Sequence, residues 1–158
     1  MPFQSQVYIL AGEGIQGTIS RVEPVYGRPA VAGDANVVAG KFVFAPASGA
    51  DGVKFNGFGA AGTVPAGVAI QNGSADDRVA GPTLAIAKDT GYFLMTKGYC
   101  WTKATTTATY GQLVLVDPAT GVITTGAAAS GTAIDTGWRV SRGGAAGKNI
   151  EIATKDVL

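Results

Sequence analysis

Residues 89–125 read DTGYFLMTKGYCWTKATTTATYGQLVLVDPATGVITT, and this stretch decides the fold. Its first half is apolar and extended, and successive side chains of a strand point to opposite faces. The sequence therefore predicts two alternating sets of side chains. One set contains Phe93, Met95, Tyr99 and Trp101, and the other contains Leu94, Thr96, Gly98 and Cys100.

The second half of the stretch predicts a β-hairpin. The apolar run 113–116 is followed by Asp117, Pro118 and Gly121, and then by the β-branched run 122–124. Asp favours the first position of a turn, Pro presets the backbone at the next, and Gly tolerates a positive φ. Two antiparallel strands joined by a tight loop are therefore expected here.

The rest of the chain consists of short apolar segments between glycine-rich turns. Segment 25–36 is rich in turn residues and is expected to be a loop, and 126–133 is expected to be a loop rather than a helix. Strands are expected at 37–44, 53–58, 66–70, 84–87, 137–141 and 149–154. In the last two, Trp138 and Val140 can face Ile150 and Ile152 across an antiparallel pair.

This pattern predicts an all-β fold, because no segment has the sustained apolar period of a helix. The expected architecture is an antiparallel β-sandwich or jelly-roll-like barrel with glycine-rich loops. The 158 residues are expected to form a single β domain, with residues 1–10 as a candidate extended N-terminal arm.

Charge and hydropathy restrict the classes of partner. The chain carries 12 basic and 11 acidic residues without a run of either sign, so no direct nucleic-acid partner is expected. Neither a signal peptide nor an apolar run of about 20 residues is present, so no membrane partner is expected and synthesis is placed in the cytoplasm. The low charged fraction of 15% indicates that partners cover part of the surface.

The residues needed for common catalytic mechanisms are missing. The chain has no histidine, so its serines lack the usual general base, and its single cysteine, Cys100, lies within an apolar strand. Asp76 and Asp77 form the one adjacent acidic pair, and their turn-like surroundings favour a solvated loop over a metal site. The protein is therefore expected to be non-enzymatic, with no catalytic, cofactor-binding or metal-binding residues.

A G-x-G-x-x-G motif spans 12–17, which is the pattern of a dinucleotide-binding loop. That function needs a helix after the glycines, so that its N-terminus meets the pyrophosphate. The following residues, 18–24, are β-branched and end at Pro24, which disfavours a helix. The glycines are better explained as loop positions.

Five short motifs follow one another along the chain: MPFQSQV at 1–7, GIQG at 14–17, VAGKFV at 38–43, PAGVA at 65–69 and YGQLV at 110–114 with its hairpin to Gly121. In this order they resemble the structural cement proteins of tailed-bacteriophage capsids. The chain departs from that family after Gly17, where Thr18 and then Val-Glu-Pro-Val at 22–25 replace an acidic residue and an N-P-R segment.

The resemblance implies a non-enzymatic protein on the outer surface of a phage head, present in the host cytoplasm during assembly. It would bind the major capsid protein, bridge neighbouring capsid subunits and associate with itself as a homodimer or homotrimer. The N-terminal arm is the candidate capsid or protomer contact, through Pro2, Phe3, Gln4, Gln6, Val7 and Tyr8. Phe3 and Tyr8 could equally pack on their own sheet.

Two other classes remain open at this stage. A carbohydrate- or receptor-binding β-module of a phage structural protein would need a row of exposed aromatic side chains. An enzyme would need a nucleotide bound at the loop 12–17.

Overall fold

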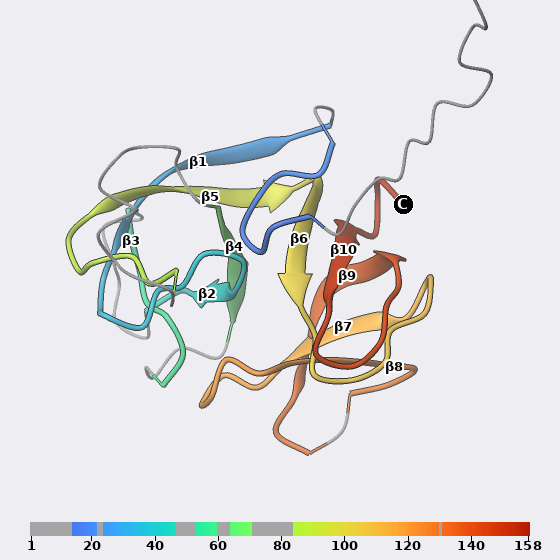
Figure 1. The fold of residues 1–158 in the computed structure, drawn as a ribbon. Helices are drawn as coiled ribbons and strands as arrows, with labels where there is room; N and C mark the ends of the chain where they lie inside the picture. The colour runs from blue at the N-terminus through green and yellow to red at the C-terminus, as the bar shows by residue number, and fades with distance from the viewer. Residues whose placement is uncertain (1–13, 22–23, 47–52, 60–63, 71–83, 130) are drawn as a thin grey trace, which may run out of the picture.

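The computed structural model describes residues 14–21, 24–46, 53–59, 64–70, 84–129 and 131–158 (Figure 1). This described part contains ten β-strands and no helix, which confirms the predicted all-β class. The strands are β1 (Tyr26–Ala32), β2 (Phe42–Phe44), β3 (Lys54–Phe55), β4 (Pro65–Ile70), β5 (Gly91–Lys97), β6 (Tyr99–Lys103), β7 (Leu113–Val116), β8 (Ile123–Gly126), β9 (Ile134–Arg142) and β10 (Asn149–Thr154).

The first sheet has the strand order β2-β4-β5-β1-β3. All its pairs are antiparallel except β1 with β3, which run parallel. Phe44 of β2 exchanges backbone hydrogen bonds of 2.8 and 3.1 Å with Asn56, which follows β3. These bonds join the two edges, so the sheet curls around its own interior.

The second sheet has the order β6-β10-β9-β7-β8, with every pair antiparallel. The chain after β6 reaches the outer edge of β8, where Thr105 N–H donates to Ile123 O at 2.9 Å and Thr125 N–H donates to the Thr106 hydroxyl at 2.8 Å. This sheet is therefore also rolled towards a barrel, as Figure 1 shows at the lower right.

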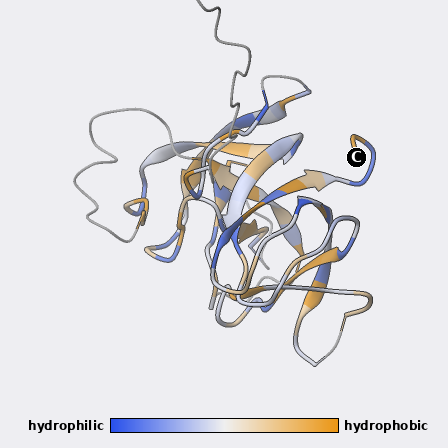
Figure 2. Ribbon diagram, turned by 45° about the vertical axis from the view of Figure 1, so that its right-hand side comes forward, coloured by the Kyte–Doolittle hydropathy of each residue, from blue (hydrophilic) through white to orange (hydrophobic). Residues whose placement is uncertain are grey.

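The apolar core has two parts. The interior of the first sheet contains a cluster that includes Val43, Tyr92 and Leu94. A larger cluster lies between the two sheets, where the rings of Phe42 and Trp138 meet edge to face at 6.0 Å. Figure 2 shows hydrophobic stretches along the strands in the middle of the molecule, while the outer turns are mixed in hydropathy.

Strands β2 and β4 pack against apolar groups on both faces. Phe42 and Phe44 belong to the cluster between the sheets, while Val43 belongs to the interior cluster. Val68 and Ala69 of β4 divide in the same way. A strand covered on both sides has continuous apolar sequence, which explains the unbroken runs FVF and VAI.

Both predicted hairpins are confirmed. Leu113 pairs with Gly126 and Val116 with Ile123, and the loop closes through Gly121, whose φ is +66°. The Asp117 carboxylate accepts the Ala119 N–H at 2.9 Å, which is the reason for an acidic residue at that turn position. In the other hairpin Val140 pairs with Ile152, and Trp138, Val140, Ile150 and Ile152 share the core cluster as expected.

The predicted alternation across residues 93–101 is wrong, because the stretch belongs to two sheets. Gly98 has a φ of +134° between β5 and β6, and this breaks the alternation. Met95 and Cys100, which were expected on opposite faces, lie in the same core cluster. Tyr99 and Trp101 consequently lie on the opposite, outer face of the second sheet.

Segment 25–36 was also predicted incorrectly, since most of it forms β1. Gly27 and Pro29 argue for a turn, but β1 pairs over its length with β5, far along the chain. Among the described residues, β3 pairs only with Val31 and Ala32 of β1, so Pro29 has no paired residue on that side in this part of the chain. The strand expected at 37–44 is limited to β2, and 84–87 contributes a single bridge, Ala85 to Val38.

Candidate functional site

The segment 14–21, here called the arm root, lies along the free edge of β6. Gly17 N–H donates to Trp101 O at 2.9 Å, Trp101 N–H donates to Thr18 O at 3.0 Å, and Ser20 N–H donates to Tyr99 O at 3.0 Å. Thr18 and Ile19 suit this extended pairing because their side chains are β-branched. The arm root thus fixes the place where residues 1–13 join the described part of the molecule.

The glycines of the arm root serve close packing. A Cβ on Gly14 would lie 2.1–2.3 Å from atoms of the Trp101 indole, and a Cβ on Gly17 would lie 2.7 Å from that of Ala39. Asn149 Nδ2 donates to Gly14 O at 2.9 Å and holds the segment over β10. The residues after Gly17 pair with β6 instead of opening a helix, so this loop has none of the geometry that binds a dinucleotide.

Dinucleotide-binding folds also use an acidic residue about 20 residues after the glycine motif to bind the ribose, and Asp34 lies near that position. In this structure Asp34 has a local structural role. Its carboxylate accepts the N–H groups of Asn36 at 2.9 Å and of Gly57 at 3.0 Å. These bonds hold the turn after β1 against the turn after β3. Neither the glycine motif nor Asp34 therefore supports a nucleotide-binding site.

Glu151 is the acidic residue beneath the arm root, and its side chain is only 8% exposed. Its carboxylate accepts hydrogen bonds from Ser20 Oγ at 2.6 Å, from Arg21 Nη2 at 2.9 Å and from the Ser141 hydroxyl. Burial pushes the pKa of Glu151 upward, but these bonds and the Arg21 charge outweigh it, so the pKa lies below its ordinary value. Glu151 therefore holds the arm root as a carboxylate anion.

Two cations stack on aromatic rings around Glu151. The Arg21 guanidinium lies 4.1 Å from the centre of the Tyr99 ring, and that of Arg142 lies 5.7 Å from the centre of the Trp101 ring. Tyr99 and Trp101 are only 7% and 8% exposed although they lie on the outer face of the second sheet. The arm root is therefore attached to the second sheet by aromatic and ionic contacts rather than by aliphatic ones.

Sequence reasoning missed this cluster. An acid between two isoleucines in a strand, as in the run NIEIAT, is a signal that a buried partner exists. It does not identify the partner, because Ser20 lies 131 residues away from Glu151. The predicted contact residues Pro2, Phe3, Gln4, Gln6, Val7 and Tyr8 lie outside the described residues, as do Asp76 and Asp77.

The described residues offer no grouping of three or more His, Cys, Asp or Glu side chains that could hold a metal ion. Cys100 is fully buried, and burial raises the pKa of its thiol, which keeps it as an unreactive thiol. No helix in the described ranges has the length and apolar character needed to cross a membrane.

An all-β body with an anchored N-terminal segment defines a class of structural and interaction modules. A comparison with protein families matches residues 3–155 to the family described as "Structural cement protein (E217 gp24/Pam3 gp6)". The chain therefore belongs to the phage structural cement protein family, as its motifs predicted. This is a family of non-enzymatic structural proteins of the phage capsid.

A search of solved structures finds a similar chain in "The capsid of Myoviridae Phage XM1". The TM-score is 0.66 at 13% sequence identity, and the match covers 100% of both chains. At this identity the match establishes a shared fold. No curated protein sequence matches the chain.

Proposed function

We propose that this protein binds the outer surface of a phage head and bridges neighbouring major capsid proteins, so that the shell resists internal pressure. It would do so as a homodimer or homotrimer, and it would reside in the host cytoplasm until it joins the shell. Membership of the cement family supports an association with capsid proteins. Multivalent attachment to a lattice raises avidity by about 10²–10⁴ over one contact.

The observation that carries the proposal is that the arm root is fixed to the second sheet. A contact segment gains affinity when its base is already fixed, because less conformational entropy is lost on binding. Hydrogen bonds to β6, the stacked Trp101 and the Glu151 cluster fix that base. Residues 2–8 then supply the aromatic and apolar contacts, with Phe3 and Tyr8 as anchors.

The carbohydrate-binding alternative lacks a comparable support. The strongly exposed aromatic side chains of the described part are Tyr26 at 60% and Tyr110 at 69%. Tyr26 lies in β1 of the first sheet, and Tyr110 precedes β7 of the second. Two single rings on different sheets form no row on which a sugar chain could stack.

The test compares the full chain with a variant that lacks residues 2–8 and with the double variant Phe3→Ser and Tyr8→Ser. Light scattering gives the oligomeric mass, and co-sedimentation with undecorated shells of the cognate phage gives binding. A cement protein is a dimer or trimer that sediments with shells. Loss of the oligomer in both variants identifies the arm as a protomer contact, and loss of shell binding alone identifies it as a capsid contact. A full-length monomer that ignores shells refutes the proposal.

A further inference from the structure

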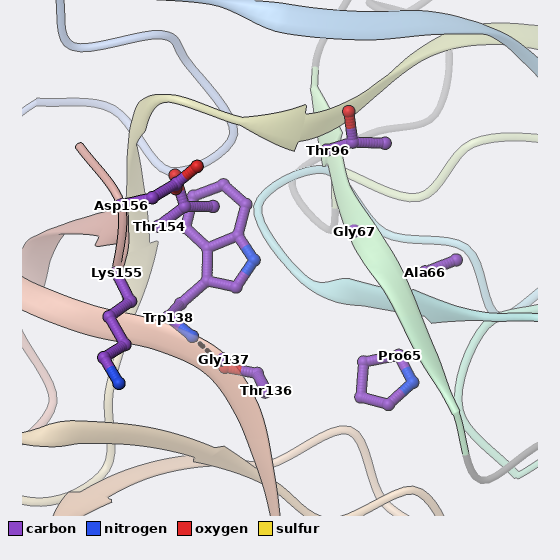
Figure 3. A pocket seen from close by; sticks show the side chains of 10 residues that line it. All are labelled: Pro65, Ala66, Gly67, Thr96, Thr136, Gly137, Trp138, Thr154, Lys155 and Asp156. Atoms are coloured by element: carbon purple, nitrogen blue, oxygen red, sulfur yellow. Dashed lines mark hydrogen bonds between the residues drawn. The ribbon is translucent and has the colours of Figure 1, made fainter.

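A hollow of about 480 Å³ lies between the two sheets (Figure 3). One wall is β4 at Pro65 and Gly67, and the other is formed by Trp138 of β9 with the C-terminal residues Lys155 and Asp156. Its size is within the range of about 300–1,000 Å³ that is usual for ligand pockets.

The hollow is lined by a hydrogen-bond donor for which the described residues supply no acceptor. Trp138 is only 4% exposed, and Figure 3 shows its indole nitrogen on the ring edge that faces β4. Among the described residues none accepts a hydrogen bond from Trp138 Nε1, although its backbone N–H donates to the Thr136 hydroxyl at 3.2 Å. The ring is largely buried, yet its N–H is not among the fully buried unpaired atoms of the described part, so a ligand in the hollow can reach it.

Two of the three threonine hydroxyl groups that line the hollow already donate elsewhere, and the third, that of Thr154, accepts the Gly98 N–H at 3.4 Å. Thr136 Oγ1 donates to Val114 O at 2.7 Å, and Thr96 Oγ1 donates to Tyr26 O at 3.3 Å. The Asp156 carboxylate is occupied by Lys97. The Lys155 ammonium at the rim has no carboxylate within ion-pair distance in the part of the chain that the structure describes. The donors left for a ligand therefore include the indole N–H, the Thr154 hydroxyl and Lys155, which favours a ligand that supplies acceptors.

We propose that this hollow binds an extended, acidic peptide segment of the capsid shell, with a carbonyl on the Trp138 N–H and a carboxylate at Lys155. The proposal rests on the proposed function, because the shell provides the peptide. The described ranges of a second copy of this chain offer no unpaired acid for Lys155, because every acid there already accepts a hydrogen bond or ion pair within its own chain. These acids are Asp34, Asp89, Asp117, Asp135, Glu151 and Asp156.

Thiol labelling tests the location. Thr96 lines the hollow and is exposed, so Thr96→Cys places a reactive thiol at the rim of the hollow. Cys100 is buried and should not react with maleimide. Ala146→Cys is the matched control, since this exposed residue lies in the turn at the other end of the β9–β10 hairpin. We expect both free variants to label, and Thr96→Cys alone to lose labelling on decorated shells.

The labelling outcomes separate this proposal from the proposed function. Absence of decoration by the wild-type protein refutes the proposed function itself. Normal decoration with position 96 still reactive, or with position 146 equally protected, refutes the peptide site alone. Protection at 96 in the free protein assigns the hollow to a second copy and also overturns the proposal.

Two substitutions test the chemistry. Trp138→Phe removes the N–H while keeping a ring, and we expect shell affinity to fall about 2- to 10-fold, the contribution of one hydrogen bond. Lys155→Gln should weaken binding and reduce its dependence on salt, because an ion pair is screened by salt. Lys148→Gln, in the hairpin turn, is the control that should bind as the wild type does. Unchanged affinity in both pocket variants, with folding intact, would overturn the proposal.

Discussion

The molecule contains two contrasting junctions. The junction between the sheets is apolar and includes the edge-to-face pair of Phe42 and Trp138. The junction between the arm root and the second sheet is ionic and aromatic, with Glu151 at its centre. Apolar burial responds little to pH, whereas a carboxylate contact depends on its proton. The body and the arm root can therefore be weakened independently of each other.

Removal of a ring from the apolar junction should produce the largest effect. Phe42 is 2% exposed, so Phe42→Ala leaves a cavity and should lower the free energy of unfolding by about 3–5 kcal/mol. Urea denaturation measures the change. Tyr110→Ala, at a residue 69% exposed, should change it by less than about 0.5 kcal/mol. Similar values for the two variants would contradict the assignment of the main core to this junction.

Neutralisation of Glu151 should give an intermediate and local effect. Glu151→Gln removes the charge paired with Arg21 and presents an amide to hydroxyl donors, which should cost about 1–3 kcal/mol. Hydrogen exchange should accelerate at the amides of Gly17 and Ser20, which bond to β6, but not in β7. Asp135→Asn is the control for charge removal, because the Asp135 side chain is 41% exposed whereas that of Glu151 is 8% exposed. Uniform acceleration over the whole chain would show that the two junctions are not independent.

Lowering the pH should produce the smallest effect of the three, and this effect should again be confined to the arm root. The pKa of Glu151 is lowered in the folded protein, so its contribution is present above the unfolded value of about 4.3 and is lost as pH falls through the folded value. Limited proteolysis by pepsin should therefore cleave near the arm root as the pH is lowered below about 4. In Glu151→Gln this pH dependence should disappear. An unchanged dependence in that variant would assign the acid response to other carboxylates, such as Asp89 or Asp117.

Local patterns predicted the parts of the fold that depend on neighbouring residues. The hairpin 113–126 follows from its alternating strands and its Asp-Pro turn, and the pair β9–β10 follows from alternation on both sides of a glycine-rich turn. β1 could not be predicted in this way, because its Gly27 and Pro29 are compensated only by pairing with β5. The alternation through 93–101 failed because Gly98 can take a backbone conformation that no pattern of side chains announces.

The sequence by itself determined the all-β class, the two hairpins, the unsuitability of the glycine motif for a nucleotide and, through short ordered motifs, the cement family. These features depend on turn chemistry, on side-chain period and on which residue types are absent. Tertiary structure alone decided that residues 91–103 connect two sheets, that Ser20 and Arg21 meet Glu151, and that the Trp138 N–H faces a hollow. Each of these depends on contacts between residues far apart in the chain, which only the packing of the two sheets brings together.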